Sequence, residues 1–145
     1  MPTLQEMIVR HDVEVLDHLD REAEVPVLNG MQRQGDVIVI PTSAELAGDP
    51  VPSDGIAVVR GDNGGNTHLL LGEGEITFRT RTDAEHEMTL GLLTVPYGSV
   101  AWLAHPEHGF LGIAPGNYEL RRQREAEITP KSEARQQPNF RLVAD

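Results

Sequence analysis

Glycine and proline interrupt this chain at short intervals, and this feature limits it to short secondary-structure elements. The fourteen glycines and ten prolines are spread along the chain and separate brief apolar runs. Proline lacks the backbone N–H that continues a helix, and glycine loses more conformational entropy than other residues when it is ordered. Short apolar runs between turn residues are typical of β-sandwiches and β-barrels. The pattern therefore predicts an all-β fold, either a small barrel or a sandwich.

About eight of these runs have the length and composition of short β-strands. Residues 75–80 alternate between polar and apolar side chains, which predicts a strand with one buried face. The segments 43–54 and 61–66 are rich in turn-forming residues and are expected to be loops. The predicted strands are residues 36–41, 56–60, 67–71, 75–80, 90–95, 99–104, 110–113 and 118–122.

Residues 1–30 differ from the rest of the chain and predict an N-terminal arm that packs on, or extends from, the main body. Residues 31–145 are then expected to form a single all-β domain with a C-terminal tail. Thr3 is in place to cap a short helix, with Glu6 at the capping-box position. Residues 13–19 fit a strand and a helix equally well, because partial alternation coexists with a shared helical face.

Charge and composition exclude several classes of protein and partner. The formal net charge is −11, and such a field repels phosphate backbones, so we expect no nucleic-acid partner. Cysteine is absent, which excludes thiolate catalysis and cysteine-based zinc sites and agrees with a cytoplasmic location. No apolar run approaches the length of a membrane span, so we expect no membrane partner.

The histidines form the clearest candidate site. His105 and His108 flank Glu107 in a segment whose proline and glycine predict a tight turn, which allows both rings to converge. His68, near the start of its own strand, is the third candidate ring. Three imidazoles with an open position suit a divalent transition metal such as zinc, iron, nickel or copper, with Glu107 or Glu73 as a carboxylate ligand. The alternative is a histidine pair that hydrogen-bonds to backbone in a turn.

A series of motifs runs through residues 34–41, 65–68, 105–109, 115–118, 123–125 and 141–145. In this order the motifs resemble a family of small, uncharacterised bacterial and phage-associated proteins. That family has a Gly-His-x-His segment, where this chain has Asn66 at the first histidine, and a tyrosine where Ala126 stands. The loss of one imidazole weakens a metal site here if the family has one. The barrel-like pattern is also similar to cupins, which bind metal through His-x-His, a glutamate and a later histidine.

The sequence contains no Gly-x-Ser-x-Gly nucleophile elbow. We therefore expect a non-catalytic, acidic β domain that forms a homo-oligomer or binds a protein partner. The apolar residues of the arm, and residues 140–143 of the tail as an edge strand, are expected to supply the contacts. The rival hypothesis is a cupin-like metal-binding protein or metalloenzyme acting on a small molecule. Its metal ligands would be His68, His105, His108 and Glu107.

Overall fold

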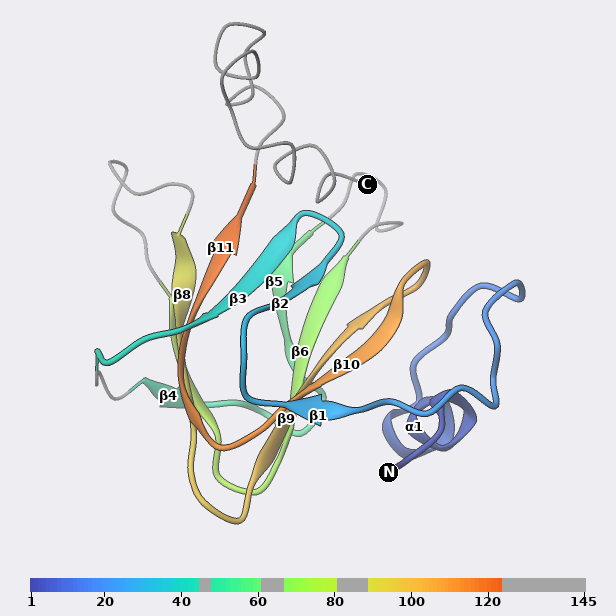
Figure 1. The fold of residues 1–145 in the computed structure, drawn as a ribbon, viewed down its shortest axis with the longest axis horizontal. Coiled ribbons are helices and arrows are strands. Elements are labelled where there is room, and N and C mark those ends of the chain that lie inside the picture. The colour runs from blue at the N-terminus through green and yellow to red at the C-terminus, as the bar shows by residue number, and fades with distance from the viewer. Residues whose placement is uncertain (45–47, 61–66, 81–88, 124–145) are drawn as a thin grey trace, which may run out of the picture.

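The chain forms a two-layer β-sandwich with one N-terminal helix (Figure 1). This computed structural model describes residues 1–44, 48–60, 67–80 and 89–123. The all-β fold is confirmed, and the open edges of both sheets make it a sandwich rather than a closed barrel. The predicted loop at 61–66 and the predicted edge strand at 140–143 lie outside the described residues.

The first sheet has five strands and the second has six. The order of the first sheet is β1 (Val27–Leu28), β10 (Gly109–Ile113), β9 (Val100–His105), β6 (His68–Glu73) and β5 (Ile56–Val59). The order of the second is β2 (Gln32–Gln34), β3 (Val37–Pro41), β11 (Gly116–Arg122), β8 (Thr89–Val95), β7 (Thr77–Thr80) and β4 (Asp49–Pro50). All pairings are antiparallel except that of β1 with β10.

The described residues contain eleven strands, and the prediction of about eight is too low. The eight predicted runs correspond to β3 and β5–β11, whereas β1, β2 and β4 were not predicted. These three strands are only two or three residues long, so they carry no readable alternation of polar and apolar residues. They lie at sheet edges, and their pairing depends on the neighbouring strand rather than on their own sequence.

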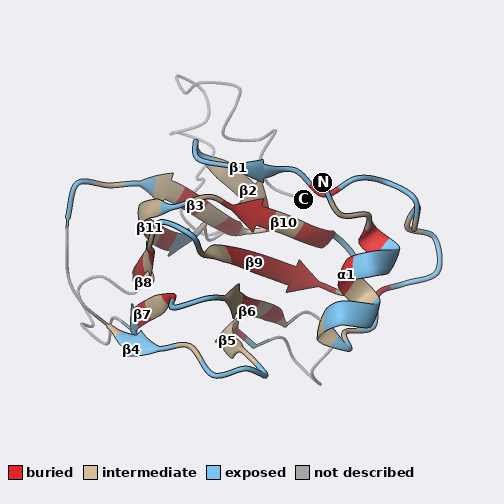
Figure 2. Ribbon diagram, turned by 90° about the horizontal axis from the view of Figure 1, so that it is seen from below, coloured by how far each residue is buried: buried red, intermediate tan, exposed pale blue. Residues whose placement is uncertain are grey.

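The main core lies between the two sheets. It consists of inward-facing side chains from both layers, among them Val39 and Leu120 from the second sheet and Leu70 and Leu103 from the first. On β3 the buried positions alternate with partly exposed ones, as expected for a strand with one covered face. On β9 every residue from Ala101 to the end is buried (Figure 2). A strand buried in this way is packed on both faces. The inner face of β9 contacts the second sheet, and its outer face contacts the N-terminal segment.

Residues 1–28, which we call the cover, pack on the outer face of the first sheet and supply its edge strand β1. Helix α1 (Leu4–His11) begins with the predicted capping box, in which Thr3 and Glu6 bond each other's backbone N–H groups. Residues 13–19 form neither a helix nor a strand, and the chain turns back there. The described part of the chain has no helix that is long and apolar enough to span a membrane.

A second core lies beneath the cover. Met7 of α1 is fully buried, and it packs in one cluster with Trp102 of β9 and Phe110 of β10. This cluster takes half of its buried members from the cover and half from the sheet. They are Leu4, Met7, Val15 and Val25 from the cover, and Leu71, Trp102, Ala104 and Phe110 from the sheet.

Candidate functional site

The three predicted histidines lie together at the end of the sandwich where β11 ends and β6 begins, uppermost in Figure 1. The ring centroids of His68 and His105 are 4.4 Å apart, and those of His105 and His108 are 4.6 Å apart. His68 and His105 are buried, whereas His108 is exposed at the turn between β9 and β10. The tight turn after β9 therefore brings both of its imidazoles to the ring on β6.

A turn from the opposite sheet closes over these rings. Gln34 pairs with Val37, so Gly35 and Asp36 form a two-residue hairpin turn between β2 and β3. Gly35 has a φ of +59°, a left-handed conformation that glycine adopts without strain. A Cβ atom at this position would lie 3.1 Å from Nε2 of His108 and 3.3 Å from Cε1 of His68. Because Gly35 has no side chain, the turn packs directly against His68 and His108.

Gln34 fixes the orientation of the buried His68 ring. The side-chain amide of Gln34 donates from Nε2 to the carbonyl oxygens of Leu103, at 2.8 Å, and Gly109, at 3.1 Å. Its Oε1 atom must then face His68, where it lies 2.9 Å from Nδ1. Because an amide oxygen only accepts, Nδ1 of His68 carries a proton. The contact joins the second sheet to three segments of the first.

Asp36 connects this ring to the protein surface. Its Oδ1 atom lies 3.2 Å from Nε2 of His68, and its Oδ2 atom accepts a hydrogen bond of 2.9 Å from Nε of Arg122. The backbone N–H of Gln123 donates to the Asp36 carbonyl at 2.8 Å, so the end of β11 holds the turn in place. Arg33 donates to the carbonyl of Gly35 at 3.1 Å and also to the side chain of Gln123.

His105 uses its Nδ1 atom within its own turn. The backbone N–H of Glu107 donates to this atom at 3.0 Å, so Nδ1 carries a lone pair and the neutral ring has its proton on Nε2. Glu107 thus contributes its backbone, and its side chain is exposed. The carboxylate of Glu73 lies elsewhere, with Arg10 and His11 of the cover.

Burial makes the imidazole of His68 a weak base. Removal from water lowers its pKa to about 4, and the neighbouring His105 and His108 add to this effect because like charges repel. The carboxylate of Asp36 acts in the opposite direction but does not outweigh burial. His68 is therefore a weak base in the folded chain and is neutral at neutral pH.

The structure places these rings close together in a hydrogen-bonded arrangement. Among the residues described, no group of three or more histidine, aspartate or glutamate side chains is placed so that it could hold a metal ion. The Nδ1 lone pair of His105 already accepts a hydrogen bond, and Nδ1 of His68 is a donor. We call His68, His105 and His108, together with Gln34 and Asp36, the histidine latch, because it fastens the two sheets at one end.

Sequence reasoning missed the second-sheet half of the latch. Gln34 and Asp36 are ordinary polar residues beside a glycine, and nothing in their spacing links them to His68, which lies 34 residues after Gln34. Their only signal is that the segments 34–41, 65–68, 105–109 and 123–125 recur in order in the resemblance noted above. The described parts of all four segments meet at the latch.

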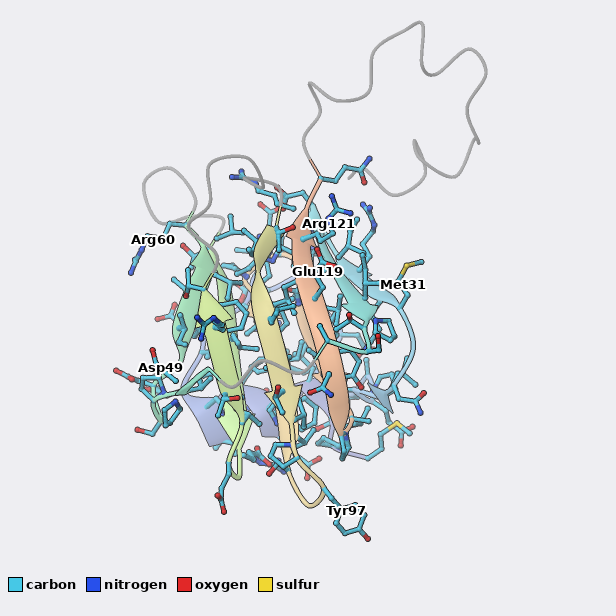
Figure 3. All side chains as sticks on the ribbon, turned by 90° about the vertical axis from the view of Figure 1, so that its left-hand side faces the viewer. Met31, Asp49, Arg60, Tyr97, Glu119 and Arg121 are labelled. Atoms are coloured by element: carbon cyan, nitrogen blue, oxygen red, sulfur yellow. The ribbon has the colours of Figure 1, made fainter. Side chains whose placement is uncertain are left out.

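A second candidate surface is apolar and lies where β1 leads into β2. Val27, Leu28 and Met31 are 37%, 47% and 71% exposed, and they are three of the seven exposed large apolar residues of the described chain. Tyr97 is 98% exposed but stands alone at the tip of the turn between β8 and β9, far from Met31 (Figure 3). The stretch 27–31 is therefore where exposed apolar side chains follow one another most closely.

Comparison with known proteins adds one finding. The model of a family described as "Domain of unknown function (DUF8820)" matches residues 33–123. No curated protein and no solved structure matches the chain. The matched range begins within β2 and ends just after β11, so it contains the whole latch and leaves the cover outside.

Proposed function

The chain belongs to the DUF8820 family, and from this premise we propose that it is a non-catalytic binding domain that associates with a protein, in the first place a second copy of itself. The observation that carries the proposal is the exposed apolar stretch formed by Val27, Leu28 and Met31. Apolar residues that follow one another at a surface are a feature of protein interaction sites, whereas single ones are not.

The backbone of β1 supports the same proposal. The carbonyl oxygens of Pro26 and Leu28 accept hydrogen bonds from the N–H groups of Gly112 in β10 and of Ala114, the residue after β10. Because backbone groups alternate in direction along a strand, the N–H and C=O of Val27 point away from β10, towards the open edge of the sheet. An exposed edge with apolar side chains favours pairing with another chain.

The histidine latch supports a binding role over a catalytic one. The hydrogen bonds of Gln34 join the second sheet to the first, and the bond to Nδ1 of His105 holds the turn between β9 and β10. A general base needs a proton acceptor directed at a substrate. Nε2 of His68 lies against the Asp36 carboxylate, and Nδ1 of His105 accepts a hydrogen bond within its own turn.

The test is the oligomeric state in solution. Light scattering over a range of concentrations should give a mass above that of one chain, and Leu28→Lys should lower the dimer fraction at least tenfold. Val9→Lys is the matched control, because Val9 is 70% exposed on α1, away from the stretch 27–31. A monomer at all concentrations, or equal loss of dimer in both variants, would contradict the proposal.

Metal binding at the latch stays a prediction. What favours it is the convergence of His68, His105 and His108 within one small region. The metal content of protein purified without an affinity tag distinguishes it from the binding-domain proposal. Stoichiometric zinc, iron or nickel that disappears in a His105→Ala variant would establish the metal site.

A further inference from the structure

We propose that two copies of this chain associate by exchanging their covers, so that residues 1–28 of each copy pack on the first sheet of the other. The inference rests on the proposed self-association and names its mode. Exchange of an identical element recreates the same contacts between chains and changes only the connecting segment. It therefore requires a cover that holds its own shape, an interface that works equally well in either chain, and a connection that can change direction.

The cover holds its own shape through its internal hydrogen bonds. Its beginning is tied to its end, since Leu4 N–H donates to Ala23 O at 2.8 Å and Val25 N–H donates to Pro2 O at 2.7 Å. The Arg21 guanidinium reaches across the intervening loop and donates to the carbonyl oxygens of Val15, Leu16 and Leu19. None of these bonds involves the sheet, so they persist when the cover moves as a unit.

The interface between the cover and the sheet is mainly apolar. Leu4, Met7, Val15 and Val25 bury the outer face of β6, β9 and β10, which lies within the family domain, while the cover lies outside it. The polar contacts are the backbone pairing of β1 with β10, one bond from the N–H of Leu16 to Pro106 O, and a charged contact at the margin. Arg10 donates to both oxygens of Glu73, at 3.2 and 2.9 Å, and His11 lies 2.9 Å from the same carboxylate. Such contacts depend on the two surfaces and not on which chain supplies them.

The connection between cover and domain is exposed and unobstructed. Residues 29–31 are exposed, and a Cβ atom placed on Gly30 would meet nothing within 4 Å. A change of direction there costs few contacts. In an exchanged dimer the two connections cross at this point, which brings the Val27, Leu28 and Met31 side chains of both copies together. Exchange thus accounts for the position of the exposed apolar stretch beside the connection.

A pair of charge reversals tests the exchange directly. In a dimer of two identical chains, either variant, Arg10→Glu or Glu73→Arg, places two like charges at the margin of each cover. An exchanged dimer can also contain one Arg10→Glu chain and one Glu73→Arg chain. In that dimer the residue at position 10 of each cover has the opposite charge to the residue at position 73 of the other chain. The two variants are unfolded together, refolded at high concentration, and weighed by native mass spectrometry. We expect mixed dimers in at least threefold excess over dimers of either variant alone.

The control pair is Glu119→Arg with Arg121→Glu. These two residues form a partly exposed ion pair within β11 of the second sheet, whereas the cover packs on the first sheet. Refolded together, they should pair at random. Random pairing of the Arg10 and Glu73 variants, when the wild type forms dimers, would show that exchange is wrong while self-association stands. A wild type that stays monomeric after the same refolding would remove both proposals.

Discussion

The histidine latch and the cover interface both join segments that are far apart in the sequence, but they do so with different physics. The latch uses directional bonds between buried or partly buried polar atoms, and each atom needs particular partners. The cover uses apolar burial, which has no preferred direction and tolerates small displacements. The comparison indicates that the latch gives the fold a sensitive point, whereas the cover gives it a contact that can form within one chain or between two.

The two regions also touch. The N–H of Leu16 in the cover donates to the carbonyl of Pro106, in the turn that carries His105 and His108. Loss of the cover should therefore weaken the histidine turn slightly, while loss of a latch hydrogen bond should leave the apolar contact of the cover intact.

The largest expected effect is the loss of the aromatic ring beneath the cover. Trp102→Ala removes the largest side chain of the second core and should lower the free energy of unfolding by about 3–5 kcal/mol. Urea denaturation followed by circular dichroism measures it. Tyr97→Ala is the control, since that ring is 98% exposed and its loss should change stability by less than about 0.5 kcal/mol. Similar effects for both variants would mean that the cover contributes little to stability.

Acid should weaken the latch and leave the apolar contact of the cover unaffected. The pKa of His68 is about 4 in the folded chain, and the ordinary value in the unfolded chain is 6.5. Between these values the unfolded chain binds the extra proton and the folded chain does not. Stability is therefore full above pH 6.5 and falls as the pH drops towards 4, by on the order of 3 kcal/mol.

The measurement is urea denaturation at several pH values between 7 and 4. A His68→Gln variant should lose this part of the pH dependence, whereas His18→Gln should retain it, because His18 is exposed on the cover. A pH profile that is the same in the wild type and His68→Gln would show that the ring titrates normally and that the latch is not the sensitive point.

The hairpin turn over the histidines should not accept a side chain. Gly35→Ala puts a Cβ atom at positive φ and 3.1 Å from Nε2 of His108, so we expect a loss of about 1–2 kcal/mol. The matched control is Gly30→Ala, where the new methyl group meets no atom within 4 Å. Thermal melting of the two variants compares them directly. Equal melting temperatures would indicate that the β2–β3 turn does not press on the rings.

The smallest expected effect is at the margin of the cover. Burial raises the pKa of Glu73, but hydrogen bonds from Arg10 and His11 outweigh it, and the pKa lies below its ordinary value. Both charged side chains are partly exposed, so Arg10→Gln should cost no more than about 1 kcal/mol, and less at high salt. A loss that exceeds this and is independent of salt would mean that the cover is held by polar bonds after all.

Much of the fold follows from local sequence. The positions of glycine and proline between apolar runs indicated eight of the strands, and Thr3 with Glu6 indicated the start of α1. These features act over a few residues, through backbone conformation and nearby hydrogen bonds, so they can be read without knowing the partner. The short strands β1, β2 and β4 were not readable, because two or three residues take their conformation from the strand beside them.

The candidate site divides in the same way. The sequence by itself determined that a tight turn brings His105 and His108 close, since proline and glycine dictate the local path of the chain. Only the tertiary structure decided that His68 joins them, that Gln34 and Asp36 supply its partners, and that the apolar residues of the cover are buried against Trp102. The physical reason is that hydrogen bonds and apolar contacts between distant segments depend on how the two sheets face each other. That arrangement is a property of the whole chain, and no single segment encodes it.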